Sequence, residues 1–293
     1  MPLPAPLGQD PALTSTSPSP QPTSAAQLSA YTERDVLSTV QRILTTMGLT
    51  APLDPAALPV DQYHSGGHQA VHRLLSGMPI ARGSHVLDVG SGLGGPARMI
   101  AALTGAHVHG VDITAEYVTA ATWLTEQAHL NEQVSFTHTP IEQLTTDRLY
   151  DAAITMHVQM NIPDKTAWYR AIGHHLRPGA TLGIWEIAAL TDDDLTWPMP
   201  WSITGTDSHL WRPGDLHTAI TDAGYTTNKW IDDAAWLKDW FTATLAAGAG
   251  ANPGLSVIDN GPACAANFAR AVLASQVTVI RATFTKTGPA PAA

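Results

Sequence analysis

The chain has 293 residues, enough for one large α/β domain with insertions or for two small domains. Its formal net charge is −10, with only 15 Lys and Arg, which argues against binding nucleic acid or an anionic membrane. No segment has the apolar length of a membrane span or the pattern of a signal peptide. A single cysteine, Cys264, excludes an intrachain disulfide and a Cys-rich metal site. We therefore expect a cytoplasmic protein.

The first 80 residues divide into a tail and a helical region. Residues 1–25 are rich in Pro, Ser, Thr and Ala and are predicted to be a disordered tail. In the region 26–80, apolar side chains from Val36 to Leu44 recur on one helical face, and Gly48 ends that pattern. A second helix is predicted over 67–75. We expect these helices to form part of a cap.

Strands and helices then alternate through residues 81–287, which we take as the main domain. Helices are predicted over 95–105, 115–130, 164–176 and 214–224. Strands are predicted over 85–90, 107–113, 134–139, 150–158, 181–187, 225–233 and 276–285. Regular alternation indicates right-handed crossovers and a mostly parallel sheet covered on both faces. The expected fold is therefore α/β and Rossmann-like, with seven strands.

Two long irregular stretches interrupt this rhythm, at 188–213 and 234–275. Long stretches of this kind are usually lids or substrate walls. They hold five tryptophans, which offer large flat apolar surfaces: Trp197, Trp201, Trp211, Trp236 and Trp240. The segment "WPMPWS" fits an apolar substrate wall, and it equally fits a rigid surface loop with buried rings. We predict that both stretches act as lids.

The stretch "VLDVGSGLGGPAR", residues 86–98, carries the strongest functional signal. Four glycines within six positions let a ligand approach the backbone closely. Asp88 stands before this loop, where a carboxylate would repel a diphosphate and suit an ammonium group. Asp112 ends the next strand, at the place where an acid accepts hydrogen bonds from ribose hydroxyls. S-adenosylmethionine fits the description of a ligand with a ribose, a cationic end and no diphosphate.

The same residues carry a family resemblance. With "DQYHSGG", "VHGVDIT", "DAAITMHVQMNIPDK" and "HLRPGATLGIWE", the loop resembles class I S-adenosylmethionine-dependent methyltransferases, over roughly residues 61–186. The arrangement is most similar to the small-molecule branch that serves specialised metabolism. This resemblance implies that the last strand runs antiparallel to the rest of the sheet.

The resemblance also implies which residues hold the cofactor. The loop would pass under its methionine part, Asp112 would hold the ribose, and Ile113 and Ile141 would pack on the adenine. The complete set implied for the cofactor is Gln62, Tyr63, Asp88, Gly90, Ser91, Gly92, Asp112, Ile113, Ile141, Glu142 and Met156.

Other residues are candidates for the acceptor side. His157 is the first choice for a general base, followed by His64 and Glu186, although each also fits a positioning or structural role. The predicted substrate contacts are Gln159, Asn161, Trp185, Trp197 and Trp201. We expect no metal site, because Gly66 and Gly67 weaken the helix that would align His64 with His68 and His72.

The expected function is methyl transfer to a small-molecule acceptor, at oxygen, nitrogen or carbon. Two alternatives remain open: a cyclisation or rearrangement that uses the same pocket, and a regulator that binds the cofactor without catalysis. A nicotinamide oxidoreductase is a more distant alternative, because Asp88 opposes a diphosphate. The sequence predicts no nucleic-acid or membrane partner and is compatible with a homo-oligomer.

Overall fold

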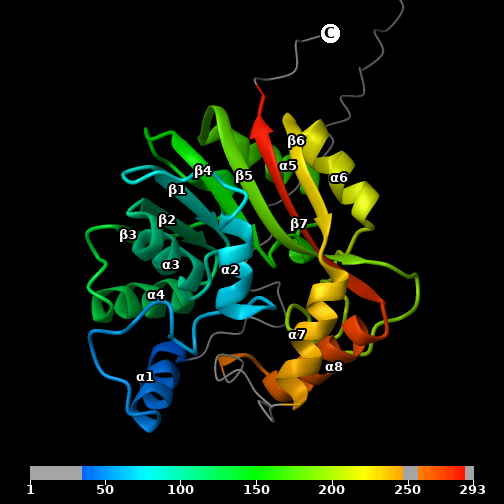
Figure 1. The fold of residues 1–293 in the computed structure, drawn as a ribbon, viewed down its shortest axis with the longest axis horizontal. Coiled ribbons are helices and arrows are strands. Elements are labelled where there is room, and N and C mark those ends of the chain that lie inside the picture. Colours follow the sequence, from blue (N-terminus) through cyan, green and yellow to red (C-terminus); the bar gives the residue numbers. More distant parts are fainter. Residues whose placement is uncertain (1–34, 247–256, 288–293) are drawn as a thin grey trace, which may run out of the picture.

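Seven strands form one twisted sheet in the computed structural model, which describes residues 35–246 and 257–287 (Figure 1). The strands are β1 (His85–Val89), β2 (His107–Asp112), β3 (Val134–His138), β4 (Tyr150–Met156), β5 (Leu176–Ala189), β6 (Tyr225–Asp232) and β7 (Val277–Lys286). Their order is β3-β2-β1-β4-β5-β7-β6, and β7 alone runs antiparallel to its neighbours. The predicted fold class is confirmed, including the antiparallel last strand.

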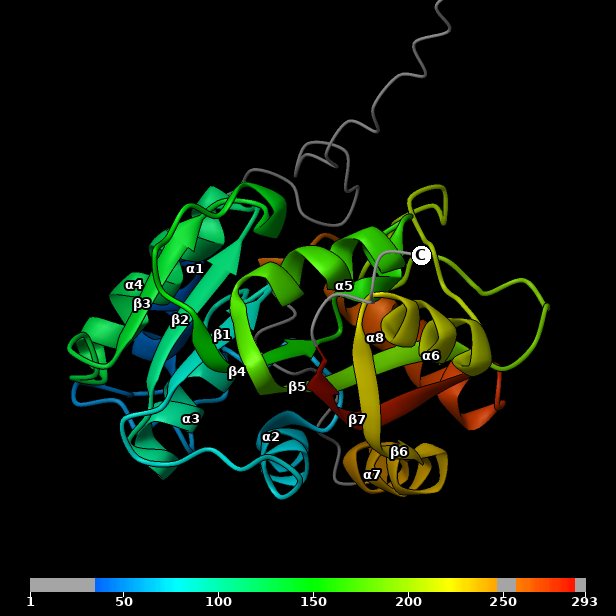
Figure 2. The same ribbon diagram turned by 90° about the horizontal axis from the view of Figure 1, so that it is seen from above.

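Helices cover both faces of the sheet (Figure 2). On one face lie α2 (Gly67–Leu75) and α3 (Gly95–Thr104), and on the other lie α5 (Lys165–His174) and α6 (Pro213–Asp222). The helices α4 (Ala115–Gln127) and α1 (Val36–Thr46) pack against each other through a third apolar cluster. These helices lie close to the predicted ranges, with α6 starting one residue earlier at Pro213, because their apolar side chains recur at helical spacing.

The pleat of β5 decides which of its side chains face which layer. Ile184 and Ala188 belong to the apolar core under α5 and α6, whereas Trp185 and Ile187 belong to the core on the α2 side. Because successive side chains of a strand alternate between faces, Glu186 points with Ile184 toward α5. This alternation has consequences for the functional site.

The two long insertions differ from each other and from the prediction. Residues 234–275 were expected to be irregular, yet they contain α7 (Ala234–Ala246) and α8 (Gly261–Leu273). The helical spacing of Leu237 and Phe241, both buried in α7, was the signal that the expectation overlooked. The first insertion spans residues 190–212, because Ala188 and Ala189 extend β5 and Pro213 starts α6.

Two short 3-10 helices complete the elements, η2 (Ile141–Gln143) after β3 and η3 (Gln159–Asn161) after β4. The tail predicted over 1–25 lies outside the described residues. Across the described ranges, we find no helix that combines the length and apolarity needed to cross a membrane.

Candidate functional site

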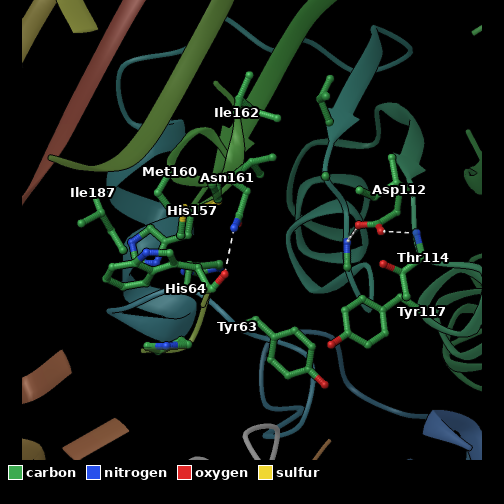
Figure 3. A pocket seen from close by; sticks show the side chains of 18 of the residues that line it. Tyr63, His64, Asp112, Thr114, Tyr117, His157, Met160, Asn161, Ile162 and Ile187 are labelled. Carbon is green, nitrogen blue, oxygen red and sulfur yellow. Dashed lines mark hydrogen bonds between the residues drawn. The ribbon is translucent and has the colours of Figure 1, made fainter. Parts of the chain in front are cut away.

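A cavity of about 540 Å³ opens at the carboxyl ends of β1, β2, β4 and β5. This volume is within the usual range of small-molecule sites. Figure 3 shows Asp112, Thr114 and Tyr117 at one end and His157, Met160 and Ile187 at the other. Parallel strands bring their carboxyl ends to one edge, which is where open α/β sheets bind ligands.

Asp112 lies at the first end, at the last position of β2. Its two carboxylate oxygens accept hydrogen bonds from the backbone N–H of Gly92 at 2.8 Å and of Thr114 at 2.9 Å. Burial raises the pKa of this carboxyl, and the two backbone donors oppose that shift. A carboxylate has about four acceptor positions, so Asp112 can still accept hydrogen bonds from hydroxyl groups of a ligand in the cavity.

Apolar and acidic side chains surround Asp112. Ile113, Tyr117 and Ile141 line the cavity there, as the sequence predicted for Ile113 and Ile141. Glu142 follows on η2, and burial raises the pKa of its carboxyl. Tyr117 of α4 was not predicted, although its place in the first turn after "VDIT" could have indicated it.

The glycine loop forms the floor of the cavity. Gly90 and Gly92 both line it, with left-handed φ values of +74° and +51°. A Cβ on Gly90 would stand 2.5 Å from a methyl carbon of Val158, so a side chain there would displace the loop after β4. The backbone is therefore bare where a ligand would cross it, as the sequence predicted.

A strap of residues 61–65 covers the loop from the N-terminal side. Arg98 in α3 donates to Asp61 at 2.8 Å, and both side chains are fully buried. Gly95 permits this approach, because a Cβ there would lie 2.3 Å from the Asp61 carbonyl oxygen. The strap brings Tyr63 and His64 to the cavity, where both were predicted.

His157 is held in a constrained conformation between the two ends of the cavity. Its φ is +58°, and its backbone N–H donates to the Trp185 carbonyl oxygen at 2.9 Å. The ring Nε2 lies 3.1 Å from Ser65 Oγ. Burial lowers the pKa of His157 well below its usual value and that of His64 to about 4, so both rings are neutral at pH 7. A non-Gly residue at positive φ carries backbone strain, which is common at functional positions.

Aromatic side chains close the second end. Phe268 of α8 packs edge-to-face against His157, Trp201 and Phe241, with ring centroids 6.0, 5.6 and 5.5 Å away. Trp201 was predicted as a substrate contact and lines this end, as does Asn161, whose amide donates to the Trp201 carbonyl oxygen at 2.8 Å. Phe241, Phe268 and Ser65 were not predicted as site residues, since no local sequence pattern links them to the glycine loop.

Three predicted cofactor contacts do not line the cavity. Asp88 is buried beneath the loop, because the pleat of β1 turns it toward α3. Its pKa is raised to about 7 by burial and by neighbouring Asp112. The prediction that Asp88 contacts the cofactor's ammonium group is therefore not supported, because its side chain does not reach the cavity. Gln62 bonds within the strap to His64 at 2.9 Å, and Ser91 is buried behind the loop.

Four residues predicted on the acceptor side do not line the cavity either. Glu186 is fully buried on the α5 side, where its carboxylate accepts the backbone N–H groups of Val158 at 3.0 Å and Gln159 at 3.2 Å. Gln159 is itself buried, and its amide donates to the Ile187 carbonyl oxygen. Trp185 donates to the Ser65 carbonyl oxygen at 3.1 Å, and Trp197 packs against Gly205. All four support the walls without lining them.

Met156 lines the cavity at the end of β4, as predicted. Among the residues that the structure describes, no three His, Cys, Asp or Glu side chains are gathered as a metal site would require.

Comparisons with known proteins match the part of the chain that holds the glycine loop and Asp112. A family model described as a methyltransferase domain matches residues 86–179. Methyltransferase phqN of Penicillium fellutanum is 36% identical over 143 residues, which cover 48% of this chain and 41% of phqN. The sterol 24-C-methyltransferase erg6 of Aspergillus fumigatus is 34% identical over 116 residues, or 39% of this chain and 31% of that protein. The chain thus spans less than half the length of these relatives.

Solved structures share the fold over more of the chain. The [4+2]-cyclase SpnF has a TM-score of 0.64 and 20% identity, covering 86% of this chain and 93% of SpnF. The geranyl diphosphate C-methyltransferase of Streptomyces coelicolor has a TM-score of 0.60 and 12% identity, covering 74% of this chain and 79% of that one. Residues 86–179 are thus similar to a methyltransferase domain, and the chain shares the fold of class I S-adenosylmethionine-dependent methyltransferases.

Proposed function

We propose that this protein binds S-adenosylmethionine and transfers its methyl group to a small-molecule acceptor in specialised metabolism. One observation carries the proposal: a single cavity joins the Asp112 end, suited to a nucleoside, to an aromatic end large enough for a second molecule. The −10 net charge supports a small molecule rather than nucleic acid as the partner, in the cytoplasm. The sequence remains compatible with a homo-oligomer.

The residues at the Asp112 end fit the cofactor. Asp112 would accept the two ribose hydroxyls, while Ile113 and Ile141 would enclose the adenine with Glu142 near its amino group. Gly90 and Gly92 leave the backbone open to the methionine part, which Tyr63 and Met156 would flank. Bound there, S-adenosylmethionine supplies a methyl group that its sulfonium has already activated.

The chain's own contribution is then to hold the acceptor in line and to exclude water. His157 is the residue best placed to orient the acceptor, because its ring is fixed by Ser65 and its backbone by the Trp185 carbonyl. A neutral imidazole can accept a hydrogen bond from a hydroxyl or amine, or take its proton during the reaction. His64 is the second candidate for this role.

A cyclisation or rearrangement in the same cavity is the second candidate function. It is favoured by the acceptor end itself, where apolar rings predominate and both histidines are neutral. Such a site can fold an apolar chain without any proton transfer. A regulator that binds the cofactor without turnover is the third candidate.

Two measurements distinguish these functions. Calorimetric titration with S-adenosylhomocysteine tests cofactor binding, and absence of binding would reject both methyl transfer and the regulator. Mass spectrometry of acceptors incubated with methyl-deuterated S-adenosylmethionine then tests transfer. A product heavier by the labelled methyl supports methylation, an isomer of unchanged mass supports cyclisation, and unchanged acceptors support the regulator.

We also propose that residues 26–80, 190–212 and 234–275 act together as a cap over the cavity. Lys165 supports this role: its ammonium donates to the carbonyl oxygens of Ile162 at 2.8 Å and His209 at 2.6 Å, which joins the first insertion to the loop after β4. Arg73 of α2 similarly donates to Asp233 at 2.7 Å and stacks over Trp236 of α7. Caps are drawn from the less stable parts of a fold, so binding should order them.

Hydrogen exchange tests the cap. Protection should rise in 190–212, in α7 and α8, and in 62–67 when S-adenosylhomocysteine and an acceptor bind. Protection confined to the glycine loop and the Asp112 turn would reject the cap.

A further inference from the structure

The two ends of the cavity differ in charge. The acids Asp112 and Glu142 lie at the cofactor end, and Asp164 lies exposed on the rim, where it caps α5 by accepting the Ala167 N–H at 2.9 Å. Among the described residues that line the cavity, none is Lys or Arg. In the sequence, residues 247–256 between α7 and α8 contain no Lys or Arg either.

The acceptor end is built from apolar groups of four separate segments. Its lining comes from the turn after β4, the end of β5, the first insertion and the second insertion, and includes Met160, Ile187, Trp201, Phe241, Ala265 and Phe268. Phe268 is 5% exposed, and its edge-to-face contacts with His157, Trp201 and Phe241 hold the rings of this end against one another.

The polar groups at this end are uncharged. They are the imidazoles of His64 and His157, the Ser65 hydroxyl beside His157, and the Asn161 amide. Burial lowers the pKa of both histidines, so neither supplies a positive charge at neutral pH. A phosphate or carboxylate placed here would lose its water without gaining a cation, which is strongly unfavourable.

We propose, building on the proposed function, that the acceptor is an uncharged and largely apolar molecule that presents one polar group to His157 and Ser65. Its apolar body lies between Phe268, Trp201 and Phe241. The chemistry of this end excludes phosphorylated and carboxylated acceptors. It also disfavours a cationic acceptor, because the polar groups lining this end include no carboxylate to pair with a positive charge.

Three matched naphthalene probes test this class by calorimetry, each titrated into protein saturated with S-adenosylhomocysteine. They are 2-naphthol, 2-naphthyl phosphate and (2-naphthylmethyl)trimethylammonium. We expect 2-naphthol to bind at least about tenfold more tightly than either charged probe. Equal or tighter binding of a charged probe, or no binding of 2-naphthol, would overturn the proposal. Failure of S-adenosylhomocysteine to bind would instead reject the proposed function.

A pair of substitutions on α8 sharpens the test. Ala265 lines the cavity, whereas the next residue, Ala266, is exposed and does not. Ala265→Arg should raise the affinity for 2-naphthyl phosphate at least about tenfold, because the arginine supplies the missing cation. It should also lower the affinity for 2-naphthol. Ala266→Arg is the matched control and should leave all three affinities unchanged. If Ala265→Arg does not fold, the comparison of probes on the unaltered protein still decides the question.

Discussion

The cofactor end and the acceptor end of the cavity are built in different ways. The cofactor end comes from strand ends and the turns directly after them, and its polar contacts are mostly backbone to carboxylate, as at Asp112. The acceptor end is assembled from segments up to about two hundred residues apart, such as Ser65 and Phe268, and side-chain packing holds it together. Local chain geometry therefore fixes the first end, whereas tertiary packing determines the second.

The largest expected effect separates the two ends directly. Asp112→Ala should weaken S-adenosylhomocysteine binding by about 100-fold, because charge-assisted bonds to two ribose hydroxyls are lost, each worth about 1.5–3 kcal/mol before relaxation. Calorimetry measures this loss. Asp112→Asn keeps one acceptor oxygen and should lose less. Unchanged affinity in folded Asp112→Ala protein would contradict the ribose placement.

The difference between the ends also explains what sequence alone could predict. The glycine loop, Asp112 and Ile141 lie within single supersecondary units, so spacing along the chain was enough to place them at the cavity. The prediction that Glu186 faces the acceptor was wrong, because strand alternation turns its side chain toward α5. A short motif does not reveal this alternation. Phe268 was missed because its contacts with Trp201 exist only after the fold brings α8 over the strand ends.

The second prediction concerns the strap between the two ends. Gly95→Ala should destabilise the protein by about 3 kcal/mol, because its Cβ would meet the Asp61 carbonyl oxygen at 2.3 Å and the Gln62 amide at 2.4 Å. Gly214→Ala in the first turn of α6 is the matched control, since a Cβ there meets nothing within 4 Å. Urea unfolding of both variants checks this. Equal stability of the two variants would show that residues 61–65 move away from the added Cβ without a measurable loss of stability.

The third prediction tests the support behind the acceptor end. Glu186→Ala should cost about 2–3 kcal/mol of stability, because the N–H groups of Val158 and Gln159 lose their buried acceptor. It should also weaken the binding of 2-naphthol more than the binding of S-adenosylhomocysteine, since the Glu186 carboxylate holds the loop that carries His157. Glu186→Gln retains an acceptor oxygen and should be milder on both counts. Full stability of Glu186→Ala would mean that this loop is held by its other contacts.

The smallest expected effect lies beneath the cofactor end, at Asp88. Burial and Asp112 raise its pKa from 3.8 to about 7 in the folded protein. Between these values the folded state holds a proton that the unfolded state has released, so this group's contribution to stability falls as pH rises toward 7 and is constant above it. From pH 5.5 to pH 8 the loss is about 2 kcal/mol, from about 1.4 kcal/mol per pKa unit. Asp88→Asn lacks this titration, so the stability of this variant relative to the unaltered protein should rise by about 2 kcal/mol between pH 5.5 and pH 8.

Urea unfolding at the two pH values measures the Asp88 effect, and the difference between the proteins removes the contributions of other titrating groups. Cofactor affinity provides the second readout. Because Asp88 does not line the cavity, Asp88→Asn should bind S-adenosylhomocysteine with an affinity within about threefold of the unaltered protein, a difference below 1 kcal/mol. A much larger loss of affinity at pH 8, where the carboxylate is ionised, would restore Asp88 as a partner of the cofactor's ammonium group. In that case the cofactor end would depend on a buried charge as well as on backbone geometry.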